Sequence, residues 1–177
     1  MKYVQYINSL LKNIIEKEKD LIIYGQNINA GSCISGLTRG LGDVNSGFTI
    51  NTPNSENTLI GIGFGLMLNS TSSIYFMKQM DFLLLGIDHL VNTYNIIRQS
   101  KPKASFTIFP VNVDSGYEGP QSALNNFNDY CSIADIEGSP VFCCELAITK
   151  PLSSNFTFVL SSPIFSVLGL RPIETSA

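Results

Sequence analysis

The chain has 177 residues, of which 44% are hydrophobic, so it can fill one core but is too short for two such domains. Its net charge is -3 and its eleven Lys and Arg residues are scattered, which excludes the basic surface that a nucleic-acid-binding protein needs. The first twenty residues are charged throughout, and no apolar run reaches the ~18 residues that span a bilayer. We therefore expect a cytoplasmic protein without nucleic-acid or membrane partners.

The cysteine and histidine spacing does not predict a metal site. The four cysteines (Cys33, Cys131, Cys143 and Cys144) lack a C-x-x-C pair, and His89 is the only histidine. We expect reduced, mostly buried thiols and no metal ion bound by this chain.

The first half of the chain predicts helices that alternate with short strands. Apolar residues recur at helical spacing over residues 2–18, and the strand "LIIYG" follows. A second helix is expected to begin at Ser55 and to run through "SENTLIGIGFGLML". The strand "SSIYF" comes next, and then a helix of about five turns that ends near Ile97.

The second half continues this alternation. The segments "ASFTIFPV", "CSIADI" and "FTFVLSS" are predicted strands, and "GPQSALNNFNDY" and "SPVFCCELAITK" are predicted helices. Strands that alternate with helices indicate an α/β fold, in which a parallel β-sheet carries helices on both faces. We expect one domain over residues 1–162 and a C-terminal tail over residues 163–177 that docks only in part.

One carboxylate, Glu56, lies at the start of the otherwise uncharged run "NSENTLIGIGFGLML". It could simply be a carboxylate in the first turn of a helix, where exposed amides favour negative charge. The glycines Gly61, Gly63 and Gly65 follow the spacing G-x-G-x-G, which is not a dinucleotide-binding fingerprint. Each costs the helix roughly 1 kcal/mol relative to Ala, which indicates that a ligand, another backbone or a second subunit packs closely there.

The motifs "YGQNI", "TPNSENTLIGIGFGL", "MDFLLLGIDHLVN" and "PVNVDSGYEGPQSALNNF" occur in an order that resembles a known family. It is the pyrimidine-binding domain of thiamine-diphosphate enzymes, specifically the beta subunit of the decarboxylating component of 2-oxoacid dehydrogenases, with transketolase more distant. The resemblance implies that Glu56 meets a ring nitrogen of the aminopyrimidine and acts as the activating acid. It also implies that Phe82 stacks on that ring and that Ser55 belongs to the cofactor site.

Three positions depart from the family pattern. Ser122 stands where the family has a substrate-side histidine, and Gln26 replaces a second carboxylate after the first strand. The stretch Gly42-Asp43-Val44, expected in a loop, is not the Gly-Asp-Gly motif through which the family holds the diphosphate and its metal.

The resemblance thus implies the pyrimidine-side subunit of a split thiamine-diphosphate enzyme, which handles a 2-oxo acid or a ketose by ylide addition (decarboxylation or ketol transfer). A diphosphate-binding partner chain would share the cofactor and bind magnesium, in a homodimer or heterotetramer. The alternative is a non-catalytic domain of the same type that serves the assembly or regulation of an active partner. The motif around Glu56 favours the enzyme, whereas Ser122 and Gln26 favour the alternative.

Overall fold

The computed structural model describes residues 3–18, 20–44, 48–100, 102–111, 137–139, 156–159 and 167–170. Within these residues a seven-stranded sheet has the strand order β2-β1-β3-β4-β6-β7-β5. The five strands from β2 to β6 pair in parallel, whereas β7 is antiparallel to both β6 and β5. The strands are β1 (Ile22–Gly25), β2 (Thr49–Asn51), β3 (Ser73–Met77), β4 (Phe106–Pro110), β5 (Glu137–Ser139), β6 (Phe156–Val159) and β7 (Val167–Leu170).

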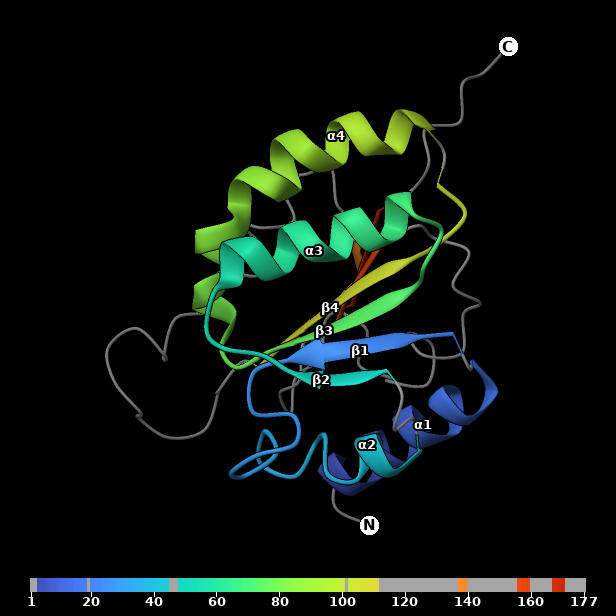
Figure 1. Ribbon diagram of the computed structural model, residues 1–177. Coiled ribbons are helices and arrows are strands. Elements are labelled where there is room, and N and C mark those ends of the chain that lie inside the picture. The colour runs from blue at the N-terminus through green and yellow to red at the C-terminus, as the bar shows by residue number, and fades with distance from the viewer. Residues whose placement is uncertain are drawn as a thin grey trace.

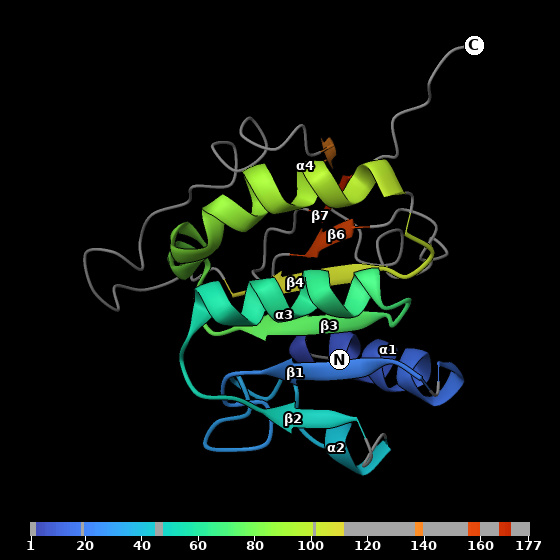
Figure 2. The same ribbon diagram turned by 45° about the horizontal axis from the view of Figure 1, so that its top comes forward.

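Helices cover both faces of the parallel part of the sheet, as Figure 1 and Figure 2 show. Helices α1 (Tyr3–Lys17) and α2 (Leu41–Val44) lie on one face, while α3 (Glu56–Leu68) and the run that contains α4 (Tyr94–Ile97) lie on the other. The predicted fold class, an α/β domain with a parallel sheet and helices on both faces, is therefore confirmed. The strands β2, β5 and β7 were not predicted, and Ser139, the first residue of the predicted helix over 139–150, belongs to β5.

The two faces of the sheet bury two separate hydrophobic clusters. Successive side chains of a strand point to opposite faces, and along β3 Tyr75 and Met77 enter the cluster under α3, whereas Ile74 and Phe76 enter the cluster over α1. Every residue of β3 and β4 is buried for this reason. Apolar residues on both sides of a strand explain why these segments show no alternating polar pattern.

The helical run after β3 is less regular than predicted. It was expected to be one helix of about five turns, but it contains the 3₁₀ segment η1 (Met80–Gly86), the π-helical segment η2 (His89–Thr93), α4 and the 3₁₀ segment η3 (Arg98–Ser100). Close contacts with α3 accompany this irregularity. A Cβ built on Gly86 would lie 2.1 Å from Ile60 Cδ1, and one built on Gly61 would lie 3.0 Å from His89 Nε2.

Most of the predicted elements among the described residues are confirmed, including the first helix, the strand after it, the helix that begins near Ser55 and the strands at β3, β4 and β6. The loop expected at Gly42-Asp43-Val44 is wrong, because these residues belong to α2. The predicted helix over residues 119–130 and the predicted strand over 131–136 lie outside the described residues, as do all but the first residue of the predicted helix over 139–150. Within the predicted tail, residues 167–170 form β7 and pair with β6.

Two glycines of α3 provide a matched test of the packing. A Cβ at Gly63 would lie 2.1 Å from Cζ of the buried Phe106 ring, whereas a Cβ at Gly65 would meet nothing within 4 Å. We expect Gly63→Ala to lower the free energy of unfolding by ~1–3 kcal/mol through overpacking. Gly65→Ala is expected to raise it by ~0.5–1 kcal/mol through helix propensity. Urea denaturation of both variants tests this contrast, and equal effects would contradict it.

Candidate functional site

The carboxyl ends of β1 and β3 lie at a switch point in the strand order of the sheet. The chain leaves β1 toward β2 on one side and then crosses back, through α3, to β3 on the other side. In open α/β sheets with this order of the first strands, ligands bind beside the carboxyl ends of the strands at such a switch point. Gln26 directly follows β1, Glu56 begins α3, and Phe82 follows β3 within η1.

Glu56 is buried and hydrogen-bonded at this edge of the sheet. Only 7% of its surface is exposed, and its Oε1 accepts a hydrogen bond of 2.6 Å from Gln26 Nε2. Gln26 itself is 0% exposed, and its own Oε1 is buried without a hydrogen-bond partner among the described residues. A carboxylate whose only role was to stabilise the first turn of a helix would stay exposed to water. The burial of Glu56 against an amide donor therefore goes beyond that role.

Two tyrosines lie beneath this pair on the same face of the sheet. Tyr24 and Tyr75 are register partners on β1 and β3, and their rings stack with centroids 5.2 Å apart. Tyr24 Oη donates to the Leu59 carbonyl, whereas Tyr75 Oη is buried with no hydrogen-bond partner among the described residues. Burial raises the pKa of both hydroxyls far above the usual range, and the charge of Glu56 raises that of Tyr75 further. Both tyrosines are therefore neutral at physiological pH.

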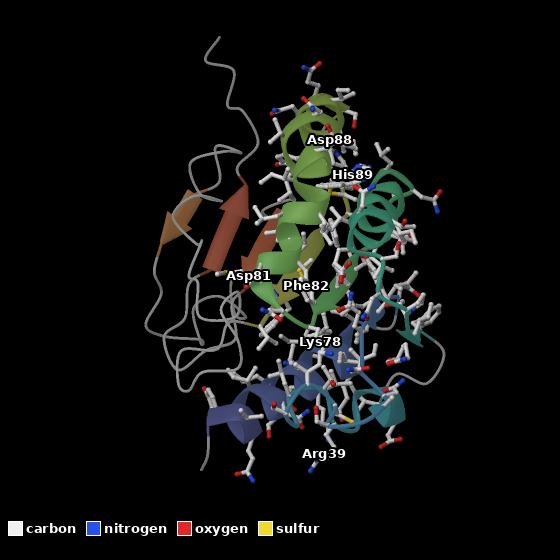
Figure 3. The ribbon with its side chains drawn as sticks, turned by 90° about the vertical axis from the view of Figure 1, so that its left-hand side faces the viewer. Arg39, Lys78, Asp81, Phe82, Asp88 and His89 are labelled. Carbon is white, nitrogen blue, oxygen red and sulfur yellow. The ribbon has the colours of Figure 1, made fainter. Side chains whose placement is uncertain are left out.

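Phe82 lies on η1, on the side toward α3, while Asp81 points the other way (Figure 3). Its ring is partly buried and packs against the cluster that contains Leu59 and Ile60 of α3. Asp81 instead accepts a hydrogen bond of 3.0 Å from Gln79. The structure thus positions Phe82 on a segment that packs against the helix that Glu56 begins; its role as a stacking ring remains a prediction.

Ser55 occupies the N-cap position of α3, as its sequence position predicts, but it makes no side-chain capping bond. Its hydroxyl donates instead to Thr58 Oγ1 at 3.0 Å, and its side chain is exposed. Ser55 is the residue before Glu56, so it belongs to the same end of α3. Its predicted contact with a cofactor remains a prediction.

The glycines of α3 serve packing within this chain as well as any interface. Gly63 faces Phe106 and Gly61 faces His89, so two of the three have partners in the same domain. His89 is half-buried beside α3 (Figure 3). Its Nδ1 lies 2.9 Å from Thr93 Oγ1. A Cβ on Gly65 would face open space.

The loop between β1 and α2 has a strained backbone that the sequence analysis did not detect. Cys33, Ile34 and Ser35 have successive φ angles of 51°, 49° and 54°, in the left-handed region that favours glycine. Asn8 Nδ2 anchors the end of the turn by donating to the Leu37 carbonyl at 2.7 Å. None of these three residues is glycine, but Gly31 and Gly36 flank them with φ angles of 59° and 91°, and these glycines are the sequence signal that could have indicated the turn.

The described part of the chain contains neither a cluster that could bind a metal ion nor a helix that could span a membrane. No group of three or more His, Cys, Asp or Glu side chains there could hold a metal ion. No described helix combines the length and the apolar character needed to cross a membrane. Cys33 is a free thiol, and the other three cysteines lie outside the described residues.

The two tyrosines give a test of the buried polar arrangement. We expect Tyr24→Phe to lower the free energy of unfolding by ~0.5–1.5 kcal/mol, because the hydrogen bond to Leu59 is lost. Tyr75→Phe removes a hydroxyl that has no described partner, so it should leave stability unchanged or raise it by ~1 kcal/mol. Urea denaturation measures both, and a larger loss for Tyr75→Phe would contradict this arrangement.

Comparison with known proteins gives one distant relative and no matching family model. The chain is 26% identical over 129 residues to the mitochondrial pyruvate dehydrogenase E1 component subunit beta of Dictyostelium discoideum. The match covers 72% of this chain and 35% of that protein, so the chain spans about a third of its length. This similarity agrees with the resemblance found in the motifs. It relates the chain distantly to the beta subunits of 2-oxoacid dehydrogenases and does not establish an activity.

Proposed function

We propose that this chain is the pyrimidine-side subunit of a split thiamine-diphosphate enzyme that acts on a 2-oxo acid or a ketose. The observation that carries the proposal is the buried Glu56 at the first residue of α3, held by Gln26 beside the carboxyl ends of β1 and β3. The distant similarity to a pyruvate dehydrogenase beta subunit supports the same class of enzyme.

The described residues fit the pyrimidine half of this cofactor. One oxygen of Glu56 accepts from Gln26, which leaves Oε2 to meet a ring nitrogen. Phe82 offers an aromatic face of the kind that stacks on a flat heterocycle, and Ser55 adds an exposed hydroxyl beside Glu56. When bound, thiamine diphosphate supplies a carbon nucleophile that attacks a substrate carbonyl.

Glu56 would act by exchanging a proton with that ring nitrogen. A carboxyl group does this well because it is positioned by Gln26 and separated from bulk water by its burial. Phe82 would orient the ring, and the tyrosine pair beneath Glu56 would add no charge to the site, since both hydroxyls stay neutral.

The diphosphate and its magnesium ion require ligands from a second chain in this proposal. Magnesium prefers carboxylate oxygens together with phosphate and water, and the described residues offer no metal-binding cluster. A partner that contains the diphosphate-binding domain would complete the site, in a homodimer or heterotetramer. The chain alone would then bind the whole cofactor weakly.

The second candidate is a non-catalytic domain that serves the assembly or regulation of an active partner. Gln26 favours it, because a neutral amide occupies the fully buried position where the resembling family has a carboxylate. The two candidates differ in whether Glu56 takes part in chemistry, and one substitution separates them.

Glu56→Gln should retain the fold and assembly but lose ~10²- to 10⁴-fold in rate, because an amide cannot exchange the proton. The measurement is exchange of the thiazolium proton with solvent deuterium in the complex with the diphosphate-binding partner, at equal cofactor occupancy. Asp43→Asn is the matched control, since Asp43 is an exposed carboxylate on α2, across the sheet. An unchanged exchange rate in Glu56→Gln would favour the non-catalytic domain.

The outer surface of the α3 layer should form a subunit contact. Exposed large hydrophobic side chains on α3 and on the helical run after β3 include Ile62 (45%), Leu85 (61%) and Ile96 (74%). We expect Ile62→Lys to weaken association in analytical ultracentrifugation, because a charge would be buried in the contact. Ile50→Lys, on the edge strand β2, is the control and should leave association unchanged. Equal association in both variants would place the contact elsewhere.

A further inference from the structure

Two buried polar atoms at the carboxyl ends of β1 and β2 have no hydrogen-bond partner among the described residues. They are Oε1 of Gln26 and Oγ1 of Thr52. The Nε2 end of the Gln26 amide donates to Glu56, whereas the Oε1 end is an acceptor with two lone pairs. Gln26 is 0% exposed, so bulk water does not reach it. The large majority of buried polar atoms in folded proteins are hydrogen-bonded, either to protein or to an ordered water molecule.

The register of the sheet places these two side chains next to each other. Gly25 and Asn51 are register partners on β1 and β2. Thr52 N donates to the Gly25 carbonyl at 2.9 Å, so the pairing continues one residue further and brings Thr52 beside Gln26. Side chains at neighbouring register positions point to the same face of a sheet. Gln26 points to the α3 face, where it meets Glu56, so Thr52 points there too.

We propose that Gln26 Oε1 and Thr52 Oγ1 bind one buried water molecule, and that Thr52 is, through this water, a positioning residue for Glu56. Oε1 can only accept and the hydroxyl can accept or donate, so a molecule with two donors and two lone pairs satisfies both atoms. Neighbouring strands lie ~4.8 Å apart, close to the separation of about 5 Å that one water molecule spans with two hydrogen bonds of ~2.8 Å. A buried water needs two to four polar partners.

Other occupants fit this position less well. A divalent cation such as calcium takes six to eight oxygen ligands, including carboxylates, and the described residues contain no cluster that could hold a metal ion. Glu56 is the only charged side chain between residues 49 and 77, and one of its oxygens already accepts from Gln26. A ligand that arrived from solvent would meet the partly accessible Glu56 and not the fully buried Gln26.

The water connects the edge strand β2 to the first residue of α3. Gln26 is held at Nε2 by Glu56 and at Oε1 by the water, which Thr52 holds in turn. The site lies within this chain and needs no cofactor, so the inference does not depend on the proposed function. In the proposed enzyme, Thr52 would help to fix Glu56 without touching the cofactor.

A high-resolution crystal structure of the full chain without ligands tests the site directly. We expect electron density for one water molecule at ~2.6–3.2 Å from both Gln26 Oε1 and Thr52 Oγ1. Thr52→Val keeps the shape of the side chain but lacks the hydroxyl, so the density should be lost, and Thr52→Ser should restore it. Thr58→Val is the matched control, because it removes an exposed hydroxyl from the same end of α3, and the water should remain.

Nuclear Overhauser effects between water and protein protons give a second measurement, in solution. A long-lived water should give signals to the side-chain amide protons of Gln26 in the wild type and in Thr52→Ser, but not in Thr52→Val. A direct hydrogen bond between Thr52 and Gln26, or the same signals in Thr52→Val, would overturn the inference. Either result would leave the proposed function standing, since that depends on deuterium exchange in Glu56→Gln.

Discussion

The rest of this structure depends on the burial of the central parallel strands on both faces. Each strand between two others must have apolar or satisfied side chains above and below the sheet, because helices cover both sides. In β3 this places Tyr75 and Met77 under α3 and Ile74 and Phe76 over α1. The same alternation directs Tyr24 and Gln26 to the α3 face, where Glu56 begins the covering helix. The position of the polar site therefore follows from which face of the sheet each strand residue points to.

Close approach between the helix layer and the sheet explains the glycine-rich composition of α3. Gly63 admits the Phe106 ring and Gly61 admits His89, while Gly86 on the neighbouring run admits Ile60. These contacts accompany departures from regular α-helical geometry in the run after β3, which includes the π-helical segment η2. Segments of this kind often occur near functional sites. The helix stability that these glycines cost is therefore offset by close packing within the domain. Gly65 makes no such contact within the described residues.

The two candidate functions differ in whether Glu56 exchanges a proton with a ligand, and the hydrogen bond from Gln26 bears on that difference. Gln26 donates a hydrogen bond to Glu56, and its amide, unlike the second carboxylate of the resembling family, adds no charge beside Glu56. The replacement departs from the family pattern, yet it leaves Glu56 buried and hydrogen-bonded, as the proposed enzyme requires. The distant similarity to a pyruvate dehydrogenase beta subunit agrees with the motif order and does not distinguish these outcomes.

The sequence alone predicted most of the helices and strands among the described residues, because helical and strand periods follow from which residues must be buried, but it missed strands β2, β5 and β7 and helix α2. It also singled out Glu56 and Phe82, because an isolated carboxylate in an apolar run and the order of motifs are local features. It did not show the partners of Gly61 and Gly63, the left-handed turn at Cys33–Ser35, or the irregular helix after β3. Only the tertiary structure decided the glycine contacts, since each joins segments far apart in the chain, whereas the turn is closed by local backbone hydrogen bonds. For the same reason, only the fold brought Gln26 to Glu56, 30 residues away, and made the carboxylate buried and paired.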